Sequence, residues 1–99
     1  MATVTETYIL EQNANDTEFP SAAKARLAAG LASGAIVSRT LTPIVDGPDL
    51  VAGKTRANVV IVYRSADDRT SFQTDSLADT ELQAYIISSG TTRINLTIS

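Results

Sequence analysis

The chain has 99 residues and a formal net charge of -3, and it contains neither cysteine nor histidine. These absences exclude a disulfide framework, a Ser-His-Asp triad and the usual zinc and copper sites. Eight basic residues are spread along the chain against eleven acidic ones. We therefore expect no nucleic-acid partner, because phosphate binding needs clustered Lys and Arg.

The overall balance of side chains predicts a globular protein. An apolar fraction of 43% and a charged fraction of 19% are ordinary for a folded domain and wrong for a disordered chain. We therefore expect one domain over residues 1–99. Basic and apolar segments typical of a signal peptide are not seen at the N-terminus, and no apolar run is long enough to cross a membrane. We expect a cytoplasmic protein, or a component of an assembled particle such as a virion.

A strand and a helix are predicted in the first third of the chain. Alternation over residues 3–11 predicts the strand, and Glu6 interrupts its apolar face, which consists of Val4, Tyr8 and Leu10. A polar loop over residues 12–17 comes next. An alanine-rich helix over about residues 20–33 follows, because Pro20 suits a first helical turn and Ser33-Gly34 suits a helix end.

Two strands around an irregular loop are predicted in the middle of the chain. Residues 35–45 resume β character, and their expected inner face consists of Ala35, Val37 and Leu41. Residues 46–54 contain two glycines and a proline, which predicts a loop longer than a tight hairpin. Residues 58–64 are apolar on both faces, so we expect them to form a central strand.

The last third is predicted to contain a short hairpin arm, a helix and a final strand. A turn at Asp67-Asp68 leads into the arm over residues 70–74. Asp75 or Ser76 is expected to cap the helix, which ends at Ser89-Gly90. The final strand alternates, and its expected inward side chains are Ile94, Leu96 and Ile98.

The predicted order of elements is β-α-β-β-β-α-β. This order predicts an α+β fold, with a mainly antiparallel sheet of four or five strands and two helices on one face. Without the short arm over residues 70–74, it becomes the β-α-β-β-α-β order of ferredoxin-like domains.

One segment resembles a phosphate-binding loop. Residues 48–55 match the pattern G-x-x-x-x-G-K-[ST] except at Pro48, which replaces the first glycine. Such a loop must open a helix whose N–H groups hold the anion, but Arg56-Ala57-Asn58 leads into the most β-prone segment of the chain. We therefore expect a turn-rich loop without a nucleotide.

Neither pair of nearby carboxylates predicts a metal or an acid–base site. Asp67 and Asp68 would point to opposite faces of a strand, and aspartates stabilise turns through their own backbone. Asp46 and Asp49 flank a turn, but the spacing of a calcium loop is absent. We predict no catalytic residue, no metal and no cofactor.

Charged and aromatic residues on the strand faces are expected to have structural roles. Glu6 and Arg39 interrupt faces that are otherwise apolar. Charges at such positions pair across a sheet, protect an edge or meet a partner. The three tyrosines are expected to be core or interface residues, namely Tyr8, Tyr63 and Tyr85.

The leading hypothesis is a non-enzymatic structural or interaction module that assembles with copies of itself or with another protein. Both terminal segments are predicted strands, so they are available for pairing at a sheet edge. The Ala-, Thr- and Ser-rich composition would suit a bacteriophage or other virion component, such as a capsid or tail protein. The predicted interface residues are Thr3, Thr5, Thr7, Asp46, Asp49, Leu50, Val51, Lys54 and Arg56.

Two alternative hypotheses remain. A small ferredoxin-like ligand-binding domain would use Lys54, Arg56 or Arg64 to contact an anion and Tyr63 or Tyr85 to stack on the ligand, although its only warrant is analogy at the level of the fold. An acidic inhibitor or immunity protein that masks a basic surface would fit the net charge.

Overall fold

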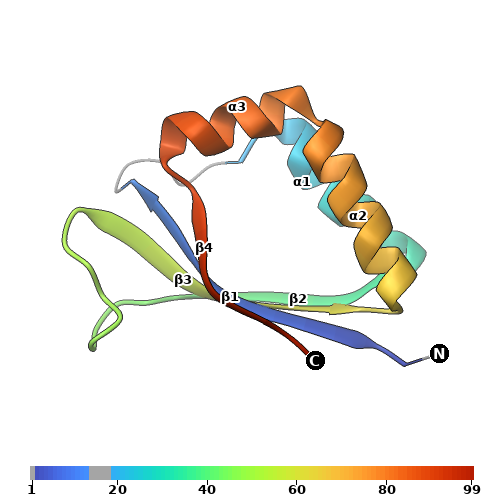
Figure 1. The fold of residues 1–99 in the computed structure, drawn as a ribbon, viewed down its shortest axis with the longest axis horizontal. Helices are drawn as coiled ribbons and strands as arrows, with labels where there is room; N and C mark the ends of the chain where they lie inside the picture. The colour runs from blue at the N-terminus through green and yellow to red at the C-terminus, as the bar shows by residue number, and fades with distance from the viewer. Residues whose placement is uncertain (1, 14–18) are drawn as a thin grey trace.

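The structure is a computed structural model that describes residues 2–13 and 19–99. A four-stranded antiparallel sheet in the order β2-β3-β1-β4 forms one layer, and three helices lie over one of its faces (Figure 1). The elements are β1 (Val4–Asn13), α1 (Ser21–Ser33), β2 (Ile36–Pro43), β3 (Lys54–Tyr63), α2 (Ala66–Ala78), α3 (Thr80–Ser89) and β4 (Thr92–Ile98).

The predicted α+β class and antiparallel sheet are confirmed, but the order of elements is β-α-β-β-α-α-β. The predicted count of two helices is therefore wrong, and the ferredoxin-like order is not matched in full. In the predicted loop over residues 12–17, residues 12 and 13 belong to β1. The remainder of that loop lies outside the described residues.

Residues 70–74 form part of α2 and not a hairpin arm. The reason is a helix cap: Ser65 Oγ accepts a hydrogen bond from the Asp68 N–H at 3.2 Å, which satisfies one of the free donors of the first turn. Asp67 and Asp68 occupy that turn, where negative charge offsets the positive end of the helix dipole. The helix therefore begins at Ala66, earlier than the predicted start at Asp75 or Ser76.

Asp79 divides the predicted second helix into two. Its extended backbone ends α2, and its side chain caps α3 by accepting a hydrogen bond from the Leu82 N–H at 3.1 Å. An aspartate that satisfies a first-turn donor favours a new helix start over continuation of the old helix. The prediction that this region ends at Ser89-Gly90 is confirmed, with Gly90 in the left-handed conformation.

β1 lies inside the sheet and is not an edge. It pairs with β3 along Val4–Asn13 and with β4 on its other side. The expectation that the N-terminal strand presents a free edge is therefore wrong, and the edges are β2 and β4. β3 is the second interior strand, as its apolar residues on both faces predicted.

A bulge in β2 changes which of its side chains face the helices. The register with β3 shifts between Ile36 and Ser38, and such a shift displaces side chains from one face to the other. Ile36 is consequently 1% exposed and belongs to the core, whereas Val37 is 56% exposed. The predicted inward position of Val37 is wrong.

β4 contains a second irregularity, at Asn95. This residue has a φ of 56°, a conformation that asparagine tolerates better than most residues. Ile94 pairs with Ile9, whereas Ile98 pairs with Glu6. Because Ile9 and Glu6 lie on opposite faces of β1, the predicted alternation of inward side chains along β4 is wrong.

Candidate functional site

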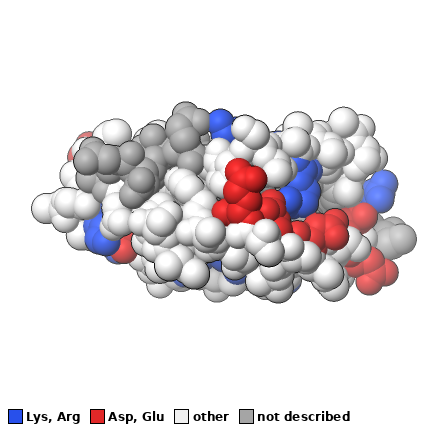
Figure 2. Space-filling view, turned by 90° about the horizontal axis from the view of Figure 1, so that it is seen from above, with Lys and Arg blue, Asp and Glu red and all other residues white. Residues whose placement is uncertain are grey.

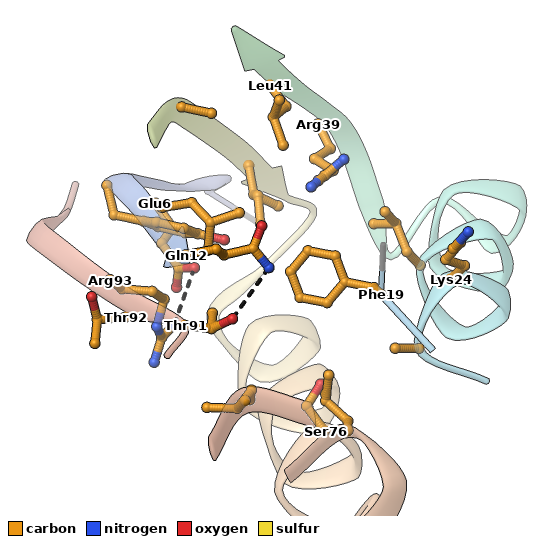
Figure 3. A pocket seen from close by; sticks show the side chains of 18 of the residues that line it. Glu6, Gln12, Phe19, Lys24, Arg39, Leu41, Ser76, Thr91, Thr92 and Arg93 are labelled. Carbon is orange, nitrogen blue, oxygen red and sulfur yellow. Dashed lines mark hydrogen bonds and ion pairs between the residues drawn. The ribbon is translucent and has the colours of Figure 1, made fainter. Parts of the chain in front are cut away.

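A cavity of about 880 Å³ separates part of the sheet from the helices, and residues of all seven elements line it (Figure 3). Its walls are mostly apolar and include Tyr8, Leu10, Leu27, Ile61 and Phe72. The cavity exists because α1 and α2 contact the sheet mainly along β2 and β3, so the other side of the helical layer is held away from it. Its volume falls within the roughly 300–1,000 Å³ range of sites that hold small molecules.

Glu6 lies on the floor of this cavity and is 2% exposed. Arg69 Nε donates a hydrogen bond to its carboxylate at 2.7 Å, and Arg93 Nη1 lies 3.7 Å from the other carboxylate oxygen. These contacts join α2 and β4 to an interior strand of the sheet. A buried carboxylate needs such partners, because an unpaired one would be costly. Of the three roles considered for Glu6, charge pairing is the one observed, although its nearer partner lies on α2 and not across the sheet.

A hydrogen-bonded group closes one end of the cavity. Gln12 Nε2 donates to the Tyr85 hydroxyl at 3.0 Å and to Thr91 Oγ1 at 3.2 Å. The Phe19 ring packs on Tyr85 with a centroid distance of 5.3 Å. Gln12 is buried on β1, so these contacts hold α3 to the end of that strand.

The two tyrosines nearest to Glu6 are held in their neutral form. Burial, reinforced by the nearby Glu6 carboxylate, raises the pKa of Tyr63 to about 12, and the same two causes raise the pKa of Tyr8. Both phenols are therefore protonated at neutral pH. They are poor candidates for a base or a nucleophile. Of the predicted core or interface positions, Tyr63 lies in the core and Tyr8 is partly buried against it.

We predict that a Tyr63→Phe substitution changes how stability depends on alkaline pH. A pKa raised from its ordinary value near 10 to about 12 stabilises the folded protein fully below pH 10 and progressively less as pH rises toward 12. The wild type should therefore lose stability relative to the variant across this window. Urea unfolding at a series of pH values measures the difference, and a difference that does not change with pH contradicts the prediction.

Positive charge gathers around the cavity even though the chain is acidic. Its lining includes Lys24, Arg26, Arg39 and Arg93, and Glu6 is the one carboxylate among the described lining residues. Arg26 pairs with Asp79 at 2.9 Å, but its Nε is buried without a hydrogen-bond partner among the described residues. On the outer side of the helical layer, by contrast, several acidic side chains lie close to basic ones (Figure 2).

Arg39 is the charged residue of the cavity whose guanidinium makes no ion pair and no hydrogen bond within residues 2–13 and 19–99. It lies on the edge strand β2, and its side chain points into the cavity above Phe19 (Figure 3). An arginine fork matches carboxylate and phosphate groups. No carboxylate of the described residues occupies the guanidinium of Arg39.

The loop between β2 and β3 contains four of the predicted interface residues in exposed positions, namely Asp46, Asp49, Leu50 and Val51. Gly47 and Gly53 adopt φ angles of 88° and 79°, which favour glycine and give the loop its two turns. The Leu50 N–H donates to the Gly47 carbonyl at 3.2 Å within the first turn. The turn-rich loop is confirmed, with apolar side chains turned outward.

The other predicted interface residues lie elsewhere. Lys54 and Arg56 begin β3 and make contacts within the chain, to Asn13 at 3.1 Å and to Glu11 at 2.6 Å. Thr5 and Thr7 lie in the interior strand β1, on the face that the helices do not cover, and Thr3 is exposed just before it. The structure does not bring the threonine group and the loop residues together in one site.

The segment that resembles a phosphate-binding loop does not have the secondary structure of one. Gly53-Lys54-Thr55 leads into β3 and not into a helix, so no helix N-terminus is available for a phosphate. Lys54 Nζ donates instead to Asn13 Oδ1. This agrees with the expectation of an ordinary loop.

The carboxylate pairs do not form a metal site over the part of the chain that is described. Asp68 accepts hydrogen bonds from Arg64 and Ser65, which lower its pKa. No group of three or more metal-ligating side chains occurs among the described residues.

No described helix is both long and apolar enough to cross a bilayer.

The sequence reasoning missed the contribution of Arg69 to the site. It placed residues near Arg69 in a turn and a strand, so this side chain was not considered as a partner for Glu6. The signal that could have found it is Ser65 followed by two aspartates, a pattern typical of a helix start.

No protein-family model matches the chain, and no curated protein matches it either.

Proposed function

We propose that the protein is a non-enzymatic structural module that assembles with copies of itself or with another protein, as a component of a virion such as a bacteriophage capsid or tail. The observation that supports this proposal is the apolar surface left outside the core. Ten large apolar side chains are exposed among the described residues, against eight buried hydrophobic ones. Scattered exposed apolar residues are ordinary, whereas grouped ones mark contact surfaces.

Most of the exposed apolar side chains belong to the two edge strands and to the β2–β3 loop. The edge strands β2 and β4 also leave backbone N–H and C=O groups unpaired on their outer sides, and such groups favour the addition of a strand from another chain. The apolar residues in these places are Val37, Leu41, Val45, Leu50, Val51, Leu96 and Ile98.

A ferredoxin-like relationship is the finer proposal for the fold. The β-α-β-β-α-β order results when α2 and α3 are counted as one interrupted helix. Domains with this order perform many unrelated functions, so the relationship does not by itself favour any activity.

A ligand-binding domain is the second candidate function. The supporting observation is the cavity of about 880 Å³ with aromatic side chains on its walls and, among its lining residues, the Arg39 guanidinium, which has no ion pair within residues 2–13 and 19–99. Of the residues predicted from the sequence for such a site, Arg56 and Tyr63 line this cavity, whereas Lys54, Arg64 and Tyr85 are not among its lining residues.

Light scattering combined with native mass spectrometry over a series of protein concentrations tests the assignment. We expect a stable species of two or more chains, because apolar side chains removed from water on assembly stabilise the contact. A protein that stays monomeric up to its solubility limit contradicts assembly with itself. A monomer whose melting temperature rises with an added metabolite favours the ligand-binding candidate.

A further inference from the structure

The tip of the β2–β3 loop combines exposed apolar side chains with unpaired negative charge. Leu50 is 47% exposed, and Val45 and Val51 are exposed as well. The carboxylates of Asp46 and Asp49 have no ion-pair or hydrogen-bond partner among the described residues. The loop therefore presents apolar side chains to water beside two carboxylates that no cation of the described residues neutralises.

Arg56 fixes this loop to the end of the sheet. Its Nη1 donates to the Asp49 carbonyl at 3.1 Å, and its guanidinium pairs with Glu11 at 2.6 Å. Leu10 and Gln12 of β1 face the helices. Glu11 lies between them in the strand, so its side chain is on the uncovered face of the sheet. The loop projects from the end of the sheet, away from the three helices (Figure 1).

The cavity on the helical side has the complementary properties. Its walls are mostly apolar, and the guanidinium of Arg39, which has no ion pair among the described residues, points into it. Arg26 adds a buried donor, Nε, that has no partner among the described residues. Buried donors normally have partners, so the Arg26 Nε, together with the half-buried Arg39 guanidinium, leaves a place for an acceptor that the described residues do not supply.

We propose that the β2–β3 loop of one copy inserts into the cavity between the sheet and the helices of the next copy. Leu50 and Val51 contact the apolar walls, and a loop carboxylate, Asp46 or Asp49, meets Arg39. This inference rests on the proposed self-assembly and specifies how it occurs. Residues 44–54 of the loop do not line the cavity, so the loop and the cavity are two different surfaces of the chain. A contact between them is head-to-tail, and such contacts generate rings or filaments.

Two variants test the loop and the cavity separately. Leu50→Asp removes the apolar tip but leaves the cavity intact, whereas Arg39→Glu reverses the charge of the cavity but leaves the loop intact. Each variant alone is expected to weaken self-association at least about tenfold, since a central residue of an interface typically contributes more than about 1 kcal/mol. An equimolar mixture should form a one-to-one complex, because one intact loop still meets one intact cavity.

Two matched control variants test whether a change in charge, or the loss of an exposed apolar side chain, is by itself enough to weaken self-association. Ile87→Asp alters an outward residue of α3 that is 83% exposed and does not line the cavity. Arg64→Glu makes the same charge reversal as Arg39→Glu at another exposed position. Both controls should assemble as the wild type does. Circular dichroism verifies folding, and Arg39→Gln replaces the Glu variant if that variant does not fold.

The possible outcomes distinguish this inference from the proposed function. If the wild type assembles and both test variants assemble equally well, the loop-and-cavity contact is wrong while self-assembly stands. If each variant dissociates but the mixture does not form a complex, the contact is not head-to-tail. A monomeric wild type contradicts this contact and assembly of the protein with itself, but not assembly with another protein. If that monomer also binds decanoate in a manner that requires Arg39, the occupant of the cavity is a small amphipathic anion.

Discussion

Arg69→Met is expected to lower the free energy of unfolding by about 3 kcal/mol, because it leaves a buried carboxylate without its main partner. Glu6 is 2% exposed, and its remaining cation, Arg93, lies 3.7 Å away on an edge strand. Urea unfolding at one fixed protein concentration measures the loss. The concentration is held constant because assembly would add to the apparent stability.

A matched substitution on the same side of the molecule provides the control. Arg64→Met breaks an exposed ion pair with Asp68, and exposed pairs contribute only about 0–1 kcal/mol. A double variant, Glu6→Gln with Arg69→Met, should be more stable than the sum of the two single effects predicts, since the two groups interact directly. Strict additivity would show that the Glu6–Arg69 contact is not the source of the loss.

Ile36→Ala is expected to cost about 3 kcal/mol of stability, whereas Val37→Ala should change it by less than about 0.5 kcal/mol. Both substitutions remove aliphatic groups from neighbouring positions of β2, but Ile36 is 1% exposed and Val37 is 56% exposed. Truncation of a packed side chain loses both burial and contacts. Thermal and urea unfolding of the two variants measure the contrast.

This pair of variants also tests the bulge in β2. Simple alternation along the strand places Val37 inward and Ile36 outward, and it would predict the opposite order of stability. A larger loss for Val37→Ala would therefore show that the register shift between Ile36 and Ser38 is wrong. A large loss for both would show that the edge strand is covered on both faces.

The local features of the chain were largely predictable from the sequence. The first helix was predicted at about residues 20–33 and is observed over Ser21–Ser33, since Pro20 and Gly34 mark its ends by their backbone preferences. The central position of β3 followed from its apolar residues on both faces. Residues 70–74 were misread, because a helix cap at Ser65 outweighed the short-range pattern that suggested a strand.

The candidate site was only partly visible in the sequence. The sequence shows Glu6 and Arg39 as charges on apolar strand faces, but it does not show which of the two has a partner of opposite charge. The partner of Glu6 lies on α2, 63 residues along the chain, whereas Arg39 has no described partner. The cavity itself depends on how closely the helical layer approaches the sheet, and no short segment encodes that spacing.

The sequence by itself determined which reactive side chains the protein has and most of its local structure. Histidine and cysteine are absent, and turns and helix ends follow from residues such as Gly47, Gly90 and Asp79, because those preferences act within a few bonds. Only the tertiary structure decided that β1 is interior, that bulges invert parts of β2 and β4, and that Glu6 meets Arg69. These features depend on contacts between distant segments, where the burial of apolar surface and the pairing of buried charge outweigh local preference.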